Sequence, residues 1–197
     1  MGENRHTKYR KLLEYCKALP PTRTAVAHPC DESSLRGALE AARLGLIAPV
    51  LCGPRSRIEG IAKQHALDLA GIEIVDAPYS QASAARAVDL VREGRAEALM
   101  KGSLHTDELM GAVVSREGGL RTARRISHCF VMDVPSHEDT LIVTDAAVNI
   151  APSLEDKVDI VQNAIDLCHA LRQPEADRKS TRLNSSHSLT SRMPSSA

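Results

Sequence analysis

The chain has 197 residues, of which 43% are hydrophobic and only 2% aromatic, so a globular core must be built mainly from Ala, Leu, Val and Ile. Lysine and arginine (25) balance aspartate and glutamate (25), and no apolar run is long enough to span a membrane, so we expect neither nucleic acid nor a membrane as a partner. The five cysteines form no CxxC pair and the N-terminus has no signal-peptide core, which indicates reduced thiols in a cytoplasmic protein.

Short aliphatic runs alternate along the chain with longer segments of helical periodicity. The predicted helices cover residues 8–18, 31–44, 55–66, 80–91, 106–114 and 154–171. The predicted strands cover residues 24–27, 49–53, 72–75, 96–100, 130–134 and 141–144. Such alternation is typical of βαβ crossovers, so we predict an α/β fold with three layers, α/β/α, around a mostly parallel sheet.

The last 21 residues differ from the rest of the chain. Residues 177–197 read DRKSTRLNSSHSLTSRMPSSA, with seven serines and no apolar periodicity, which is typical of a disordered segment. The string also resembles what a short-read sequencing adapter encodes in one reading frame, so we expect an artefact rather than a natural flexible tail. The predicted division is a helix and linker at 1–23, a partial α/β domain at 24–176 and this tail at 177–197.

Active sites in parallel sheets lie beyond the carboxyl ends of the strands, which singles out the loops at 28–31, 53–54, 101–106 and 145–152. The loop after the strand at 96–100 has the composition of an oxyanion-binding turn. Gly102 lets a ligand approach the backbone, and Lys101 adds a positive charge. Ser103 and Thr106 offer hydroxyls and amides at the start of a helix. The alternative is an ordinary capped turn with a surface lysine.

Two further segments beside predicted strands carry polar side chains. Residues 118–128 contain three arginines, among them Arg121 and Arg125, whose planar guanidinium groups suit phosphate oxygens; the alternative is a solvated basic loop. Asp145 directly follows a predicted strand, and Asn149 can hold a turn or orient a ligand; the alternative is an Asx turn before a helix cap.

The remaining motifs of common enzyme classes are missing. The chain has no P-loop, no GxSxG and no GxGxxG sequence. His28 with Cys30 and His128 with Cys129 lack the spacing of zinc ligands, so we expect no metal site.

Four strings together resemble the phosphate acetyl/butyryl transferases: AVAHPCDESSLRGALEAARLGLIAPVLCGP, ALMKGSLHTDELM, GGLRTARRISHCFVMDVP and TLIVTDAAVNIAPSLEDKVDIVQNAI. They occur in the family's order over residues 24–171 and look closest to the butyryltransferase-like branch, including members fused behind an enoyl-CoA hydratase domain. The resemblance implies acyl transfer between coenzyme A and inorganic phosphate as substrates, without a further cofactor, in a homo-oligomer. It also implies two α/β/α domains of the isocitrate/isopropylmalate dehydrogenase type, with the active site between them.

The resemblance also implies which residues bind the substrate or its phosphate group. The positions that match the family's motifs are Lys101, Gly102, Ser103, Thr106, Arg121, Arg125, Ser127, Asp145 and Asn149. Family members continue well beyond this chain, so we expect an inactive fragment that is truncated before the second domain is complete. The catalytic residues are then expected in the missing C-terminal part.

Two other functions stay open at the level of the sequence. A dehydrogenase-like domain that binds a dinucleotide does not need GxGxxG in the isocitrate type, and bound Mg²⁺ and NAD would favour it. A non-catalytic domain of a hydratase fusion would be favoured by a hydratase-type reading frame upstream of Met1.

Overall fold

The computed structural model describes residues 7–137, 139–145 and 147–171. Two compact units make up the chain: Met1–Arg125 with Asp133–Glu138, and Ile126–Met132 with Asp139–Ala197. The predicted tail at 177–197 lies outside the described residues, and the predicted boundary between residues 23 and 24 stays a prediction.

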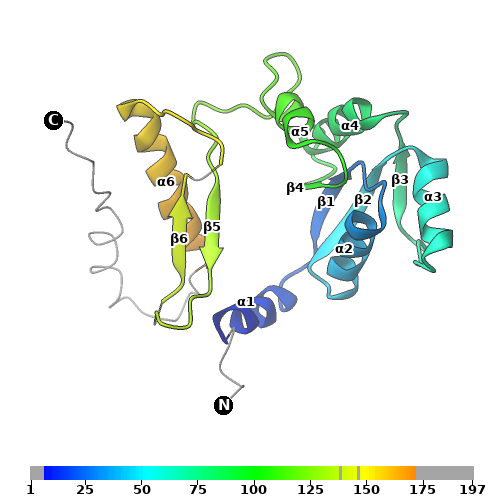
Figure 1. Cartoon of the computed structure of the whole chain (residues 1–197), viewed down its shortest axis with the longest axis horizontal. Helices are drawn as coiled ribbons and strands as arrows, with labels where there is room; N and C mark the ends of the chain where they lie inside the picture. The colour runs from blue at the N-terminus through cyan, green and yellow to red at the C-terminus, as the bar shows by residue number, and fades with distance from the viewer. Residues whose placement is uncertain (1–6, 138, 146, 172–197) are drawn as a thin grey trace. The chain divides into compact units, whose positions relative to one another are not determined.

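The first unit is built on a parallel sheet of four strands in the order β3-β2-β1-β4 (Figure 1). The strands are β1 (Thr22–Ala27), β2 (Ile47–Gly53), β3 (Glu73–Asp76) and β4 (Ala98–Lys101). The helices are α1 (Thr7–Lys17), α2 (Glu32–Arg43), α3 (Arg55–Gln64), α4 (Ser80–Arg92) and α5 (Thr106–Val113). Strand β1 pairs with both β2 and β4 and therefore lies inside the sheet. The predicted α/β class with a mostly parallel sheet is confirmed.

Helices cover both faces of this sheet, because the buried positions of β1 and β2 are apolar apart from Thr24. Ala25 and Ala27 point to one face, where the core includes α4 residues Ala84, Ala87 and Leu90 and α5 residue Leu109. Val26 points to the other face, where the core includes α2 residues Leu35 and Ala38 and α3 residues Ile58 and Ala62. This alternation gives the three layers α/β/α.

Small side chains on β1 and α4 shape the first of these two core layers. Cys52 of β2 belongs to it and is fully buried, and burial raises the pKa of its thiol to about 12. Dispersion between closely packed alanines and leucines stabilises this layer in the absence of aromatic rings.

The ends of the helices follow local signals in the sequence. Asp31 caps α2, because its carboxylate accepts a hydrogen bond of 2.8 Å from the amide of Ser34. Gly45 follows α2 with φ of 73°, a left-handed conformation that glycine adopts at little cost. Helix α5 begins with a capping box, in which Glu108 accepts a hydrogen bond of 2.9 Å from the amide of His105.

The second unit pairs β5 (Cys129–Met132) with β6 (Leu141–Thr144) in an antiparallel ladder, and α6 (Leu154–Leu171) packs on β6. Phe130 and Val143 are direct partners across this ladder and are both about half exposed. Ile160 is the one buried position among the described residues of α6. The predicted mostly parallel sheet therefore describes the first unit, whereas the two strands of the second unit pair in the antiparallel direction.

No helix in the described ranges has both the length and the apolar content that a membrane-spanning segment requires.

Strands β1 and β4 stay in close contact beyond their last paired residues. The amide of Gly102 donates to Ala27 O at 2.8 Å, and the amide of Ser103 donates to His28 O at 2.9 Å. A Cβ atom at Gly102 would overlap these two carbonyl oxygens. Position 102 therefore requires glycine for the close approach of two backbones.

We predict that Gly102→Ala lowers the free energy of unfolding by about 1–3 kcal/mol, because the added methyl group must push the loops after β1 and β4 apart. Gly60→Ala is the matched control. Gly60 lies on an exposed part of α3 with no atom in the way, so alanine there should be neutral or stabilise the chain by up to about 1 kcal/mol. Urea denaturation of the three proteins measures the difference, and equal stability of the two variants would contradict the steric argument.

Candidate functional site

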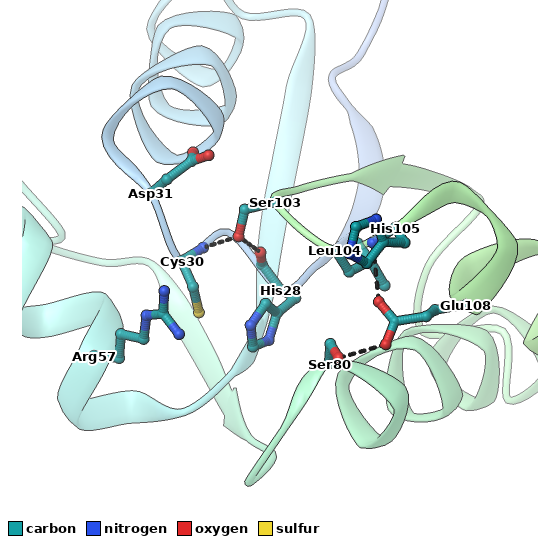
Figure 2. A pocket seen from close by; sticks show the side chains of 9 residues that line it. All are labelled: His28, Cys30, Asp31, Arg57, Ser80, Ser103, Leu104, His105 and Glu108. Carbon is teal, nitrogen blue, oxygen red and sulfur yellow. Dashed lines mark hydrogen bonds between the residues drawn. The ribbon is translucent and has the colours of Figure 1, made fainter.

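A pocket of about 330 Å³ lies at the carboxyl end of the parallel sheet (Figure 2). It is lined by His28, Cys30, Asp31, Arg57, Ser80, Ser103, Leu104, His105 and Glu108. The chain leaves β1 toward β2 and β3 on one side, whereas β4 is inserted on the other side of β1. Ligands of open α/β sheets bind at such a reversal of strand order, so the pocket occupies the position where a site is expected.

Ser103 ties the two loops of the pocket together. Its hydroxyl donates to His28 O at 2.9 Å and accepts from the amide of Cys30 at 3.2 Å. Its own amide also donates to His28 O. The side chain of Ser103 therefore builds the pocket as well as lining it.

The other residues of the predicted oxyanion loop lie around the pocket rather than in its lining. Lys101 donates from Nζ to Leu104 O at 2.8 Å and to Gly102 O at 3.3 Å, so its ammonium group caps the turn. Thr106 is exposed at the first position of α5. Of the four residues predicted in this loop, the structure brings Ser103 into the pocket wall.

The carboxylates of the pocket already hold hydrogen bonds. Glu108 accepts from the hydroxyl of Ser80 at 2.6 Å and from the amide of His105, and these two bonds lower its pKa. Hydrogen bonds from the hydroxyl and amide of Ser34 likewise lower the pKa of Asp31. Both groups are therefore ionised near neutral pH.

Against these two carboxylates, the pocket lining has one guanidinium group, that of Arg57. Arg57 lies in the first turn of α3, and Figure 2 shows it on the opposite side of His28 from Ser80 and Glu108. Burial lowers the pKa of His28, the charge of Arg57 lowers it further, and Glu108 opposes the shift. The imidazole is therefore neutral at pH 7.

Three of these lining residues, Arg57, Ser80 and Glu108, lie outside the loops that the sequence analysis singled out. The loop at 28–31 was singled out as a strand end, but nothing in the sequence indicated that Arg57, Ser80 and Glu108 would meet it. Arg57 lies in the helix after β2 and Ser80 in the helix after β3, so their proximity depends on strand order. Strand order is a property of the whole sheet and has no local signal.

The predicted basic segment is divided between the two units. Arg121 and Arg125 are exposed and belong to the first unit, whereas Ser127 belongs to the second, where its hydroxyl accepts a hydrogen bond of 2.9 Å from Asn163. The role of these three residues in binding stays a prediction.

Asp145 and Asn149 do come together, directly after β6. Asn149 Nδ2 donates to Asp145 Oδ2 at 2.6 Å and to Ile126 O at 3.0 Å. Asp145 Oδ1 accepts from the amides of Ala147 and Val148, both at 3.0 Å. This geometry is the Asx turn that the sequence left open as an alternative, and it does not by itself test a role in binding.

Comparison with known proteins places the chain in a family. The family model described as "Phosphate acetyl/butaryl transferase" matches residues 79–177, just over half of the chain. The chain belongs to this family.

Relatives from several bacteria agree with this assignment. The phosphate acetyltransferase of Rhizobium meliloti is 61% identical over 165 residues, which cover 84% of this chain and 52% of the relative. The phosphate butyryltransferase of Clostridium beijerinckii is 37% identical over 162 residues, which cover 82% of this chain and 54% of the relative. The chain spans about half the length of the curated relatives it matches.

The fold is also similar to that of a solved structure. The phosphotransacetylase from Streptococcus pyogenes matches with a TM-score of 0.69 over 84% of this chain and 59% of that chain, at 16% identity. At this identity the likeness concerns the fold alone.

The residue range that the family model matches contains only some of the residues that line the pocket. Ser80, Ser103 and Glu108 lie inside the matched range of 79–177, whereas His28 and Arg57 lie outside it. Within the described residues, no group of three or more His, Cys, Asp or Glu side chains could hold a metal ion.

We predict that the carboxyl group of Asp145 titrates near pH 2. Partial burial alone would raise its pKa, but hydrogen bonds from the amides of Val148 and Ala147, the side chain of Asn149 and the amide of His128 lower it to about 2. Because the folded-state pKa is depressed, the stabilisation is present above the unfolded value of 3.8 and is lost as the pH falls from there toward 2.

Carboxyl ¹³C NMR, assigned with Asp145→Asn, measures this titration directly. The same variant should lower the free energy of unfolding at pH 7 by about 1–2 kcal/mol, and this gap should narrow below pH 4. A midpoint near 4, or a gap that does not depend on pH, would show that the turn does not hold the carboxylate.

Proposed function

We propose that the protein transfers an acetyl- or butyryl-type acyl group between coenzyme A and inorganic phosphate. The observation that carries this proposal is family membership, together with relatives named phosphate acetyltransferase and phosphate butyryltransferase. The pocket at the reversal of strand order in the sheet supports it, because a small polar substrate needs a site of this kind.

In the proposed reaction, the thiolate of coenzyme A attacks the carbonyl carbon of an acyl phosphate. The tetrahedral oxyanion then collapses, the carbon–oxygen bond to phosphate breaks, and the thiol proton ends on hydrogen phosphate. The reverse direction begins with attack by a phosphate oxygen. Amides and arginine side chains stabilise the negative charge that develops, and a base takes up the thiol proton.

We assign the binding of phosphate or acyl phosphate to the residues that match the family's motifs. These are Lys101, Gly102, Ser103, Thr106, Arg121, Arg125, Ser127, Asp145 and Asn149. Ser103 supports the assignment from the pocket wall, and Lys101 from the turn that it caps. The other positions rest on the resemblance.

The proposal also covers the second domain, the oligomeric state, the location in the cell and the substrates. We propose a second domain of the isocitrate/isopropylmalate dehydrogenase type, a homo-oligomeric cytoplasmic enzyme, and coenzyme A and phosphate as substrates with no further cofactor. Because the chain spans about half the length of its relatives, turnover is expected from a full-length form and not from this chain alone.

We predict that Arg125→Ala in a full-length form raises the KM for phosphate by about 10-fold or more, because a charge-assisted hydrogen bond contributes about 1.5–3 kcal/mol. A suitable full-length form joins residues 1–171 of this chain to the second half of the Rhizobium meliloti relative. Arg125→Lys should restore only part of the loss, since an ammonium group cannot bind two oxygens in one plane.

Steady-state kinetics, with thiol release from acyl-CoA in the presence of phosphate, measures both variants. Arg43→Ala is the matched control, since this arginine side chain is 74% exposed on α2 and should leave both constants unchanged. Wild-type constants for both Arg125 variants would remove Arg125 from the site. Absence of turnover in the joined form itself would contradict the proposed function.

A further inference from the structure

His28 is the most constrained residue of the pocket. Its backbone adopts φ of 54°, which is uncommon for a residue other than glycine. The amide donates to Cys52 O at 2.7 Å, and the carbonyl oxygen accepts from the amides of Cys30 and Ser103 and from the hydroxyl of Ser103. Persistence of such a conformation requires that the surroundings determine it, and four hydrogen bonds to the backbone of His28 do so here.

One hydrogen-bond chain fixes the proton on the His28 ring. Ser83 is fully buried, and its Oγ lies 2.8 Å from Tyr79 O and 2.9 Å from His28 Nδ1. The single hydroxyl proton of Ser83 is needed for the carbonyl of Tyr79, since two oxygen acceptors at 2.8 Å without a proton would repel each other. His28 must then donate from Nδ1–H to Ser83 Oγ.

This tautomer leaves Nε2 as a hydrogen-bond acceptor. The side chain of His28 lines the pocket although the residue is only 8% exposed, and Nε2 has no partner among the described residues. The charged or titratable groups that line the same pocket are Arg57, Asp31, Glu108, His105 and the Cys30 thiol. The two carboxylates have their own donors in Ser34, Ser80 and His105, whereas Nε2 has none.

We propose that the His28 Nε2 acceptor makes the pocket selective for an oxyanion that still carries a proton, namely hydrogen phosphate, over a fully deprotonated oxyanion such as sulfate. The inference rests on the proposed function and adds to it the residue that recognises inorganic phosphate. Hydrogen phosphate donates its hydroxyl to Nε2, and its charged oxygens accept from the guanidinium group of Arg57.

Sulfate has the same shape and the same charged oxygens but no proton to donate near neutral pH. It would place an oxygen lone pair against the Nε2 lone pair, and that acceptor would be left buried without a partner. The carboxylates of Asp31 and Glu108 repel either anion, so only phosphate regains part of this cost through the bond to His28. A site that hydrogen-bonds one ligand rejects an analogue that lacks the donor.

Isothermal titration of the full chain with sodium phosphate and with sodium sulfate at pH 7.5 tests the inference. Phosphate should bind at least about 10-fold more tightly than sulfate. His28→Asn should reduce this ratio to about 3 or less, because asparagine tolerates the left-handed backbone and its amide can donate as well as accept. Ser83→Ala should have a similar effect, since it frees the ring to change tautomer.

His65→Asn is the matched control, because His65 lies at the C-terminal end of α3 and outside the pocket lining, and this variant should keep the wild-type ratio. Equal affinity for the two anions, binding of neither anion, or an unchanged ratio in both pocket variants would overturn the inference. The ring ¹⁵N shifts of His28 give an independent check, and an Nε2–H tautomer in the wild-type chain would also overturn it.

The two proposals can fail separately. Turnover by the joined full-length form without anion selectivity in the chain would remove the role of His28 and keep acyl transfer. Selectivity without turnover in the joined form would keep the phosphate site and remove acyl transfer.

Discussion

Three donors converge on the carbonyl oxygen of His28: the amides of Cys30 and Ser103 and the hydroxyl of Ser103. A carbonyl at the end of a strand would normally be satisfied by the neighbouring strand or by water, but here it joins the loops after β1 and β4. Because Gly102 has no side chain, the two loops can approach closely enough for these bonds to form. The position of the pocket and the left-handed backbone of His28 both depend on this one acceptor, whereas Ser83 holds the ring.

The pocket combines rigidity with mixed charge. Two ionised carboxylates and one guanidinium group line a space that a neutral imidazole also faces. A purely basic pocket would attract any anion, whereas a neutral imidazole among these charges favours an anion that carries a proton to donate. Fixed hydrogen bonds at Ser80, Ser83 and Ser103 hold the polar groups in place, so little ordering is required when a ligand enters.

Much of the first unit could be predicted from the sequence, because the spacing of apolar residues and the residues that cap helices are strong local signals. The strand at 24–27 is the end of β1, and the helix predicted from Ser80 begins there as α4. The antiparallel pairing of β5 with β6 could not be predicted, since a short aliphatic run is compatible with either direction. The Ser103 loop was found because glycine and serine after a strand have a chemical meaning. Arg57 and Glu108 were not, because they are ordinary helix residues until strand order brings them together.

The burial of two cysteines bears on how thiols of this protein react. Cys30 and Cys52 lie in the core, and burial raises the pKa of both thiols, so almost none of either is thiolate at neutral pH. A thiol reacts with a disulfide reagent only when its thiolate attacks the reagent, so Cys52 would stay unlabelled in the folded chain. Cys16, Cys129 and Cys168 are only partly buried and remain open to such reagents. The rate at which Cys52 is labelled would therefore report how often the parallel sheet opens, since Cys52 must leave the core before it can react.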